Sequence, residues 1–455
     1  MTSVLSPARL GGRARTVTRG RLRHRSAVAA AVVVLCSFSM RLGLVARENA
    51  ADVARYYSDA SSYLEPARHL LDDGAFLNKQ GVVEVQRMPG YPAFLATLMT
   101  MTGRDLRLVL LLQTLILSLT PVILYAVWRD IVPLRAAMLG GMIAAVSPWS
   151  AVLATAPMSD GLFLLVLASA FLAMKFTVRA QRMWAVAGAI CLGFLTGGAV
   201  LVRPMSPLVL LVPAALWFAL GSRATTAKWL VAIAFVCALI PPALWRERNI
   251  RVRQFASISE VSGLAAWQYL AARVRSEVTG EDRFVLSITA EREEESWGVP
   301  ARSEPMNAER WRRAMEVFRA HPVLTAYSFA RSALEHALHP SPDVLTAPRL
   351  RFPGDYVVLG NIWFALLSLA MAGLVRCVRA QRDDGNDMNR RFVIAVFVVC
   401  VALTLASGIS FGEGSRLRAP LEAVVPLLAG VGAIRAWERF RTPRRSIVEA
   451  ATAAS

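Results

Sequence analysis

Long apolar stretches constrain this chain more than any other feature of its sequence. Runs of about 16–23 apolar residues recur along it, and about 20 residues of helix cross the hydrocarbon layer of a bilayer. Spans of this kind are helical, because backbone groups in lipid must find their hydrogen-bond partners within their own segment. The sequence therefore predicts an all-α integral membrane protein. About ten spans are expected, at residues 26–46, 106–128, 131–150, 157–176, 183–202, 205–221, 227–245, 357–376, 391–409 and 417–436.

The distribution of charge predicts how these spans are oriented. The chain carries 51 Lys and Arg against 32 Asp and Glu, a net charge of +19, and nucleic-acid binding is one interpretation of such a charge. The basic residues, however, cluster beyond alternate spans: the short inner segments hold about 24, and the short outer connections hold only Arg203, Arg416 and Arg418. This pattern predicts a multi-pass protein of the cytoplasmic (inner) membrane with both termini in the cytoplasm and no nucleic-acid partner. The basic residues of loop 47–105 do not fit this pattern, because the loop is expected on the outer side.

Two long polar segments, 47–105 and 246–356, are expected on the outer side. They interrupt a membrane domain at 26–436, which lies between an unstructured basic tail at 1–25 and a second cytoplasmic tail at 437–455. A cleaved signal peptide is the rival interpretation of the first span, but no small-x-small cleavage site is evident, so a retained anchor is favoured.

The longer outer loop is predicted to be helical. Asn307 is the expected N-cap of an amphipathic helix that ends at His321 and Pro322. Pro322 can start the next helix, which continues to His336.

The first outer loop holds the most informative polar residues. Asp59 lies about a dozen residues beyond the first span, Tyr63 and several apolar residues follow at helical spacing, and Gly74 is a natural helix stop. Asp59 is thus expected at a helix N-terminus, where the helix dipole favours its ionised form. An N-cap and nothing more is the alternative. The loop ends on Arg87, followed by Pro-Gly-Tyr91-Pro at the start of an apolar helix.

This succession of motifs resembles the bacterial relatives of protein O-mannosyltransferases and the aminoarabinose transferase of lipid A. Both are multi-span (GT-C type) glycosyltransferases that use polyprenyl-phosphate sugars. Other segments are similar to elements of these enzymes: the connection that carries Asp160, the pair Arg203-Pro204, residues 245–249, and Arg416 with the start of the last span. The resemblance extends over residues 26–270 and more loosely over 350–436.

The resemblance implies roles for two acids. An acid in the first outer loop is the proposed general base of these enzymes, a role that falls here on Asp59, with Asp160 assisting. The family often has two adjacent acids in this loop, whereas Ser58 and Ala60 flank Asp59, so only one acid is carried over.

Elementary chemistry supports the same assignment. A departing lipid phosphate needs no proton, but an acceptor hydroxyl benefits from a carboxylate that takes its proton. The phosphate needs cations, and arginine binds phosphate oxygens in pairs. A single displacement assisted by one base inverts the anomeric carbon. Candidate substrate-binding residues are Tyr63, Arg87, Tyr91, Arg203, Arg248 and Arg416, with Arg246 and Arg418 as further phosphate-binding candidates. The alternative for each arginine is snorkelling at the membrane interface.

Metal binding is weakly indicated. His336 and His339 lie three residues apart, and Asp72 is next to Asp73, but helix ends explain both pairs. The five cysteines lie in or beside apolar runs with no CxxC spacing. No metal ligand is predicted and no cofactor is certain, although a divalent metal is left open.

The sequence thus predicts transfer of a hexosyl or pentosyl group from a polyprenyl-phosphate sugar donor to a hydroxyl acceptor at the outer face. The donor and the membrane lipid are expected partners, and a glycan, a lipid and a protein all fit as acceptor. A transporter and a non-catalytic polysaccharide-assembly subunit are the alternatives. Transporters place ionisable groups near mid-membrane, whereas most acids and arginines here lie at span ends.

Overall fold

The computed structural model describes residues 8–46, 57, 59–221, 224–338, 356–410 and 414–453. Within these ranges the regular structure is helical, and the one β contact is an isolated bridge between Leu77 and Val83. The predicted all-α class is confirmed. Segments 47–56 and 339–355, which belong to the two predicted outer loops, lie outside the described residues.

The first half of the chain forms helices of very different length. They are α1 (Ala8–Ala46), α3 (Ala60–Asp72), α4 (Gly90–Thr102), α5 (Leu106–Leu117), α6 (Thr120–Trp128), α7 (Leu134–Val146), α8 (Pro148–Thr155), α9 (Ser159–Arg179), α10 (Arg182–Val202), α11 (Leu208–Leu220) and α12 (Ala224–Arg253).

The second half begins with the helices of the long outer loop and returns to apolar helices. They are α13 (Val261–Leu264), the π-helix η1 (Ala265–Ala271), α14 (Ala272–Thr279), α15 (Arg283–Glu295), α16 (Glu304–Ala320), α17 (Pro322–Leu338), α19 (Tyr356–Asp383), α20 (Asp387–Ala406), the 3-10 turn η2 (Ser407–Ile409), α21 (Gly414–Leu417), α22 (Ala419–Glu422) and α23 (Val425–Ala453).

Seven helices among the described residues are long and apolar enough to cross a membrane, or eight if the bent pair α7–α8 is counted as one span. The predicted multi-pass character is confirmed. The ten expected spans differ at two places: α11 has only 13 residues, and residues 417–436 are divided among α21, α22 and the start of α23.

Two of the expected spans are broken by local sequence. The span at 106–128 is divided at Ser118, whose hydroxyl donates to the carbonyl of Thr114, just before α6 begins with Pro121 in its first turn. Helices α7 and α8 meet at an angle of 52°. Ser147 caps α8 there, and Pro148 occupies its first turn, a position in which proline costs no hydrogen bond.

Helix α23 packs closely against α19 and α7 because glycines line the contacts. A Cβ on Gly373 of α19 would lie 1.9 Å from the carbonyl oxygen of Leu428, and one on Gly432 of α23 would lie 2.1 Å from that of Leu369. Gly430 of α23 meets α7 in the same way. Small residues that let helix backbones approach are typical of membrane helix interfaces.

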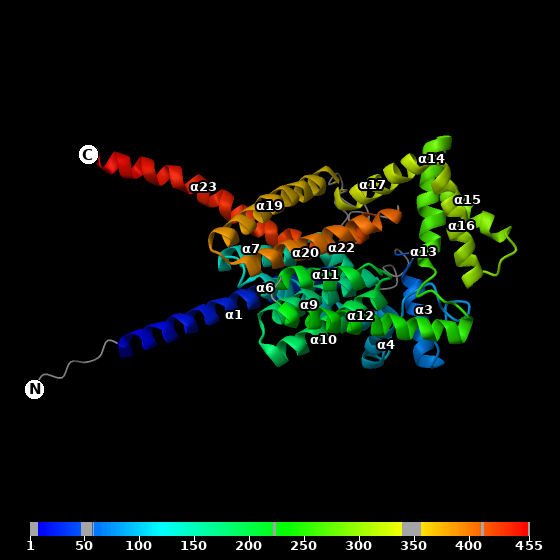
Figure 1. Ribbon diagram of the computed structural model, residues 1–455, viewed down its shortest axis with the longest axis horizontal. Coiled ribbons are helices and arrows are strands. Elements are labelled where there is room, and N and C mark those ends of the chain that lie inside the picture. The colour runs from blue at the N-terminus through cyan, green and yellow to red at the C-terminus, as the bar shows by residue number, and fades with distance from the viewer. Residues whose placement is uncertain are drawn as a thin grey trace, which may run out of the picture.

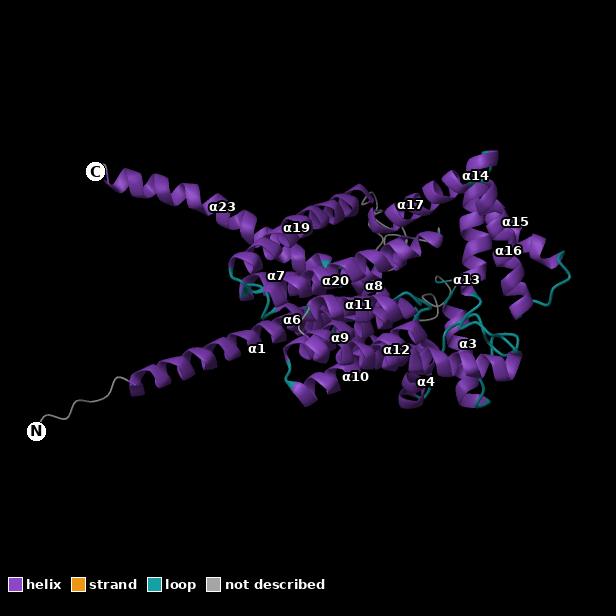
Figure 2. Ribbon diagram, in the orientation of Figure 1, coloured by secondary structure: helices purple, strands orange, loops and turns teal. Residues whose placement is uncertain are grey.

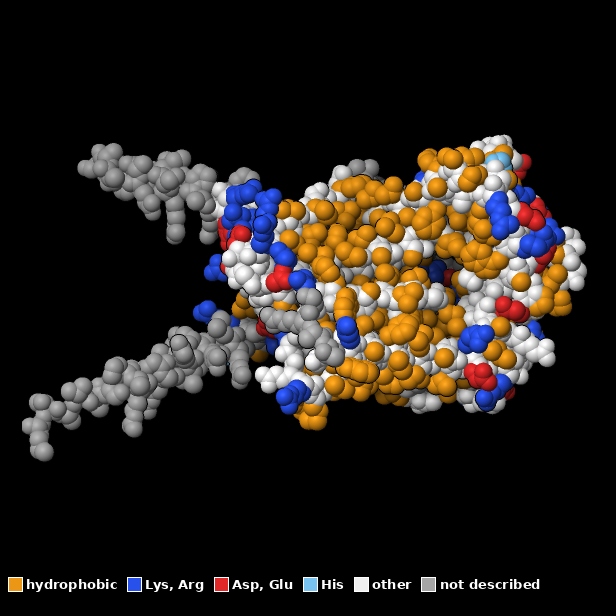
Figure 3. Space-filling model, viewed as in Figure 1, with side chains coloured by type: hydrophobic (Ala, Val, Ile, Leu, Met, Phe, Trp, Pro, Cys, Tyr) orange, Lys and Arg blue, Asp and Glu red, His pale blue; other side chains and the backbone are white. Residues whose placement is uncertain are grey.

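The arrangement separates two ends of the molecule. Helix α1 and the end of α23 extend from one end, whereas α3 and α13–α16 lie at the other (Figure 1). Loops gather mainly at these two ends (Figure 2). Apolar side chains form a broad belt between them, and charged side chains concentrate on either side of it (Figure 3). Helices from both predicted outer loops, α3 and α13–α16, therefore share one end of the molecule.

Two local predictions are wrong. Residues 8–25, expected to be an unstructured tail, continue α1 as helix, since adding residues to an existing helix costs far less than nucleating one. Helix α16 begins at Glu304, with Ser303 as its N-cap and a proline in its first turn. Asn307 is inside this helix, and its side-chain oxygen accepts from the N–H of Gly263. The break at His321 and the start of α17 at Pro322 are as predicted.

Candidate active site

Asp59 lies at the N-terminus of α3 as predicted, but it does not cap the helix. Its side chain makes no capping hydrogen bond. One carboxylate oxygen instead accepts from Nη2 of Arg87 at 2.6 Å, and the other pairs with Nη1 of Arg416 at 2.9 Å. The carboxylate therefore joins two segments that are far apart in the sequence, which a simple N-cap would not do.

Asp160 is in the first turn of α9, with a side chain that is 1% exposed. Nη1 of Arg203, the residue that follows α10, donates to one of its oxygens. Nε of Arg416 lies 3.4 Å from the other oxygen. Arg416 thus bridges the two carboxylates, and five residues form one alternating chain of charges. We call this group the Asp59 cluster, and it consists of Arg87, Asp59, Arg416, Asp160 and Arg203.

The two predicted tyrosines support Arg87 in different ways. The Tyr63 hydroxyl is 3.2 Å from Oγ of Ser159 and accepts from Arg87 Nη1 at 3.4 Å. The Arg87 guanidinium also lies over the Tyr63 ring, 4.8 Å from its centroid. Tyr91 is fully buried, packs edge-on against Tyr63, and donates to Gln113 at 2.8 Å. Because the ring is fully buried and the hydroxyl is bonded to Gln113, we assign Tyr91 a packing role behind Tyr63.

Hydrogen bonds hold the segment that carries Arg87. The Glu84 carboxylate accepts from the backbone N–H groups of Gln86 and Arg87, at 2.6 and 3.0 Å. Ser259 donates to the carbonyl of Gln86 at 2.6 Å. Arg248 donates to the carbonyl of Glu84 at 3.0 Å, and its guanidinium lies over the Trp245 ring. Arg248, which was predicted to bind substrate, therefore holds this segment, and it is not among the described residues that line the cavity.

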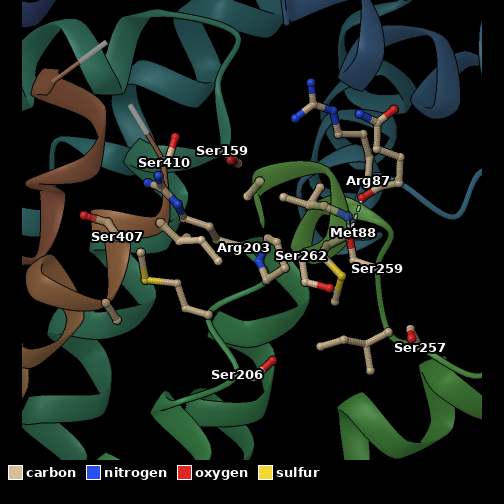
Figure 4. A pocket seen from close by; sticks show the side chains of 18 of the residues that line it. Arg87, Met88, Ser159, Arg203, Ser206, Ser257, Ser259, Ser262, Ser407 and Ser410 are labelled. Carbon is tan, nitrogen blue, oxygen red and sulfur yellow. Dashed lines mark hydrogen bonds between the residues drawn. The ribbon is translucent and has the colours of Figure 1, made fainter. Parts of the chain in front are cut away.

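A cavity of about 770 Å³ borders the cluster (Figure 4). Arg87, Arg203 and Arg416 line it, whereas Asp59 and Asp160 are not among its described lining residues. Figure 4 shows that the labelled lining residues come from segments far apart in the chain. The remaining wall includes Arg246, Ser257, Ser259, Ser262, Tyr269, Trp311, Ser407 and Ser410.

The charges in the cluster stabilise one another. Burial alone would raise the pKa of Asp59, but Arg87 and Arg416 outweigh it and hold that pKa below its ordinary value. Burial would lower the pKa of Arg416, and the nearby Asp160 and Asp59 carboxylates reverse this effect. Three arginines and two aspartates leave an excess of one positive charge beside the cavity, to which Arg246 adds a second. The wall is therefore suited to an anionic ligand.

Arg418, another candidate for phosphate binding, lies elsewhere. Its guanidinium is fully buried between the rings of Trp149 and Trp363, 4.4 and 4.1 Å from their centroids. It is not among the described residues that line the cavity. A single residue, Leu417, thus separates an arginine of the cavity wall from an arginine of the helix core.

Several polar residues that line the cavity were not predicted from the sequence to be part of the site. Ser257, Ser259 and Ser262 line it just after the basic end of α12, and this serine-rich run was a signal that could have been used. Tyr269 reaches the wall from η1, and π-helices are frequent at functional sites. The sequence offers no comparable signal for a π-helix.

The pairs considered for metal binding are engaged in other contacts. Asp72 pairs with Arg104 at 2.6 Å, and Asp73 with His69 at 2.5 Å. Nδ1 of His336 is 3.0 Å from the Ser407 hydroxyl, while His339 lies outside the described residues. Over the described part of the chain, no group of three or more His, Cys, Asp or Glu could hold a metal ion.

Residues 86–245 match the model of a family described as dolichyl-phosphate-mannose-protein mannosyltransferase. The match is confined to this segment, about a third of the chain. The matched segment includes Arg87, Asp160 and Arg203 of the cluster, whereas Asp59 precedes it and Arg416 follows it.

The fold is similar to that of an archaeal oligosaccharyltransferase. AglB from Archaeoglobus fulgidus, in complex with an inhibitory peptide and a dolichol-phosphate, matches 94% of this chain with a TM-score of 0.53 and 12% identity. An Archaeoglobus fulgidus oligosaccharyltransferase in complex with Zn and sulfate matches 93% of this chain at 14% identity, also with a TM-score of 0.53. This chain spans about half of each of those chains, 52% and 51%. The segment that matches the mannosyltransferase family model thus lies in a chain whose fold is similar to that of an archaeal oligosaccharyltransferase.

A third solved structure, ArnT from Cupriavidus metallidurans bound to undecaprenyl phosphate, aligns over 90% of this chain and 77% of its own, at 16% identity. Its TM-score of 0.40 is too low to support a conclusion about the fold. No curated protein sequence matches this chain.

Proposed function

We propose that this protein transfers a sugar from a polyprenyl-phosphate carrier to a hydroxyl acceptor at the outer face of the cytoplasmic membrane, with both chain termini in the cytoplasm. One observation carries the proposal: three arginines line a single cavity of about 770 Å³, and Asp59 pairs with two of them. The match to the mannosyltransferase family model supports the reaction class. The dolichol-phosphate in the archaeal structure supports the type of carrier.

The arginines are proposed to bind the phosphate of the donor. Guanidinium groups bind phosphate oxygens through paired, charge-assisted hydrogen bonds and remain protonated. Arg87 and Arg203 approach the cavity from different segments, and Arg416 lies between the two carboxylates. Cations fixed in this way stabilise the charge that accumulates on the phosphate as the sugar leaves.

Asp59 is proposed to be the general base. The acceptor oxygen attacks the anomeric carbon and forms the new glycosidic bond, while its proton passes to the Asp59 carboxylate. The bond from that carbon to the phosphate oxygen breaks, and the electron pair leaves with polyprenyl phosphate. A single displacement of this kind inverts the anomeric configuration.

Donor binding would make Asp59 a stronger base. In the structure both oxygens of Asp59 pair with arginines, which lowers its pKa. A phosphate that attracts Arg87 and Arg416 would weaken these pairs. The pKa of Asp59 would then rise toward the working pH, where a carboxylate accepts protons more effectively. The donor would thus prepare the base for its own reaction.

Asp160 is proposed to assist by orienting the cations. Its buried side chain accepts from Arg203 and lies 3.4 Å from Arg416, so it fixes two arginines of the cavity wall. It is placed to hold the phosphate-binding groups rather than to take the proton.

The carboxylates of Asp59 and Asp160 are not arranged to bind a divalent cation between them. The Arg416 guanidinium lies between these carboxylates and pairs with both. We therefore assign no step to a metal. Excess chelator is expected to leave the transfer rate unchanged, and a loss of activity that added metal restores would contradict this assignment.

The decisive experiment uses the purified full chain, a radiolabelled polyprenyl-phosphate sugar, and membranes as the source of acceptors. The proposal requires labelled polyprenyl-free product, released polyprenyl phosphate, and inverted anomeric configuration in the product. A scaffold subunit would form no product. A transporter would move the labelled lipid across sealed vesicles and leave its sugar–phosphate bond intact.

A further inference from the structure

Helix α17 of the long outer loop exposes a row of hydrophobic side chains. Val323, Tyr327, Leu334 and Leu338 are 79%, 50%, 53% and 39% exposed. They follow one another at intervals of four, seven and four residues, so they lie along a single face of the helix. We call these four residues the α17 stripe. A surface helix of a soluble protein turns such a face toward the core and its polar face toward water.

In α17 the polar face is the one that packs against the protein. Nη1 of Arg273 donates to the Ser332 hydroxyl at 2.6 Å, and Nη2 of the same guanidinium pairs with Glu335 at 2.6 Å. Ser328, Ser332 and His336 are all buried. The orientation of α17 is thus reversed relative to a helix that faces water, and its surroundings on the stripe side are expected to be apolar.

The α17 stripe continues the apolar belt of the membrane helices. Trp363 of α19 donates to the carbonyl of Ala337 at 2.8 Å, which fixes the last turn of α17 beside a helix long and apolar enough to span a membrane. The same part of α19 exposes Val358, Ile362 and Phe364. From there α17 runs toward α14 (Figure 1), and apolar side chains continue over it from the belt (Figure 3). This continuity indicates that lipid covers the stripe.

The chemistry of the stripe favours apolar contact over attraction between charges. Arg331, next to the stripe, already pairs with Glu277 at 2.9 Å and with Glu335 at 3.2 Å. A lipid phosphate is therefore not required as its partner. Leu334 lies toward the α19 end of the helix and suits acyl chains. Tyr327, farther out, suits the headgroup level, where aromatic rings with a polar tip are enriched.

We propose that the α17 stripe is a lipid-contact surface, which inserts into the leaflet on the cavity side and holds one wall of the cavity at the level of that leaflet. Leu334 and Leu338 lie deepest, and Val323 lies nearest to water. A helix rises 1.5 Å per residue, so the contact with lipid decreases along α17 from its C-terminal end.

The lipid contact acts on the cavity through η2. This turn lines the cavity with Ser407 and Ile409. Nδ1 of His336 lies 3.0 Å from the Ser407 hydroxyl. A Cβ on Gly408 would lie 2.7 Å from the carbonyl oxygen of Phe329, so the backbones of η2 and α17 are in close contact. A leaflet that holds α17 therefore also holds this wall.

The first test is photocrosslinking of the purified full chain in vesicles of phosphatidylethanolamine and phosphatidylglycerol, with tritiated phosphatidylethanolamine as the probe. Benzoylphenylalanine replaces Leu338, Leu334 or Val323, one site at a time. We expect strong transfer of tritium to the protein at Leu338 and Leu334 and weaker transfer at Val323. Arg312 of α16 is the matched control site, since its side chain is also 53% exposed, and it should take up no more tritium than protein without the crosslinker.

Three results of this experiment would overturn the proposal. Absence of lipid at both Leu334 and Leu338 would mean that the stripe faces water. Crosslinks from these sites to a second copy of the chain, or to another segment of the same chain, would identify a different occupant. Equal labelling at Arg312 would show that the stripe has no special position relative to the leaflet.

The second test measures the effect on the cavity wall by hydrogen exchange in the same vesicles. The double variant Leu334→Asp with Leu338→Asp should speed exchange of the amides at 407–410 several-fold, because the wall then opens more readily. Arg312→Asp should leave this exchange unchanged. Unchanged exchange in the double variant would overturn the link from lipid to cavity.

Neither measurement uses a sugar donor or depends on the proposed reaction. Lipid labelling at the stripe in a protein that transfers no sugar would therefore keep this proposal and reject the transferase. Sugar transfer by a protein whose stripe takes up no lipid label would do the reverse.

Discussion

Two groups of charged residues lie close together in this protein and have opposite surroundings. The Asp59 cluster borders a cavity of about 770 Å³. The second group, which we call the sealed cluster, consists of Arg41, Arg418 and Glu422. The pocket beside it measures only about 10 Å³, close to the smallest space that holds one water molecule.

The sealed cluster is held by fixed neighbours. Arg41 donates to the Ser37 hydroxyl at 2.7 Å and to the Ala145 carbonyl at 2.8 Å. Glu422 accepts from Ser147 at 2.9 Å, and Nε of Arg418 lies 3.9 Å from it. The pocket beside these groups leaves no room for a ligand larger than water. We therefore expect the sealed cluster to act on stability, and the arginines of the Asp59 cluster that line the cavity to act on substrate binding.

Arg416 and Arg418, separated by one leucine, give the sharpest form of this comparison. Arg416→Gln should lower kcat/KM by about 10²–10³-fold, the usual loss when one preorganised donor is removed from a transition state. Folding should be retained, because Asp59 keeps Arg87 and Asp160 keeps Arg203. Transfer assays and thermal unfolding of the purified variant measure both effects. Arg68→Gln, which removes an exposed ion pair on α3, is the control, and an active Arg416→Gln enzyme would contradict the assignment.

Substitutions in the sealed cluster should act on stability. Arg418→Met leaves the Glu422 charge buried without its nearest cation, and breaking a buried pair in this way costs roughly 3–5 kcal/mol. We expect a strongly lowered unfolding temperature and poor recovery from membranes. Protein that does fold should retain the wild-type KM for the donor. A stable Arg418→Met protein with a raised KM would place Arg418 among the donor-binding residues.

Arg248 should show an intermediate effect, since it holds the segment that carries Arg87. Arg248→Gln removes its bond to the Glu84 carbonyl, and kcat/KM should fall about tenfold, as expected for a loosened supporting contact. Arg248→Lys should recover part of the activity. A loss as large as that of Arg416→Gln would instead indicate direct contact with the substrate.

The smallest expected effect concerns pH. Arg87 and Arg416 hold the pKa of Asp59 below its ordinary value of 3.8. The ionised Asp59 carboxylate therefore stabilises the folded protein fully at pH values above its ordinary pKa. This stabilisation is lost only as the pH falls through the lower pKa that Asp59 has in the folded protein. The difference in unfolding temperature between wild type and Asp59→Asn should stay constant from about pH 7 to pH 5 and shrink below about pH 4. A difference that disappears between pH 7 and pH 5 would mean that the pKa of Asp59 is raised.

The sequence predicted the spans better than their interruptions. Apolar length is a local property, so the positions of α9, α10 and α12 follow from it. The bend at Ser147 depends on cap and proline geometry. The division of residues 417–436 into short helices occurs where Arg418 packs between Trp149 and Trp363, a contact set by the tertiary fold.

The candidate site was predictable in its residue types and less so in its contacts. Spacing alone placed Asp59 at a helix N-terminus, and the resemblance to known glycosyltransferases selected Arg87, Asp160 and Arg416. Neither could show that one guanidinium pairs with two aspartates from different helices. Arg248 was predicted to bind substrate, and its bond to the Glu84 carbonyl was not foreseen, because sequence position places it at the end of α12 but does not give the direction of its side chain.

Transfer by Asp59→Asn, compared with Asp72→Asn at the other end of α3, tests the central claim most directly. Asp72 forms only an exposed ion pair with Arg104, so its variant controls for the loss of an acid. In a single-turnover assay with labelled polyprenyl-phosphate sugar, Asp59→Asn should be slower by about 10²–10⁴-fold, as expected for loss of a general base. Asp72→Asn should match the wild type. A folded Asp59→Asn protein that transfers sugar at the wild-type rate would contradict the account.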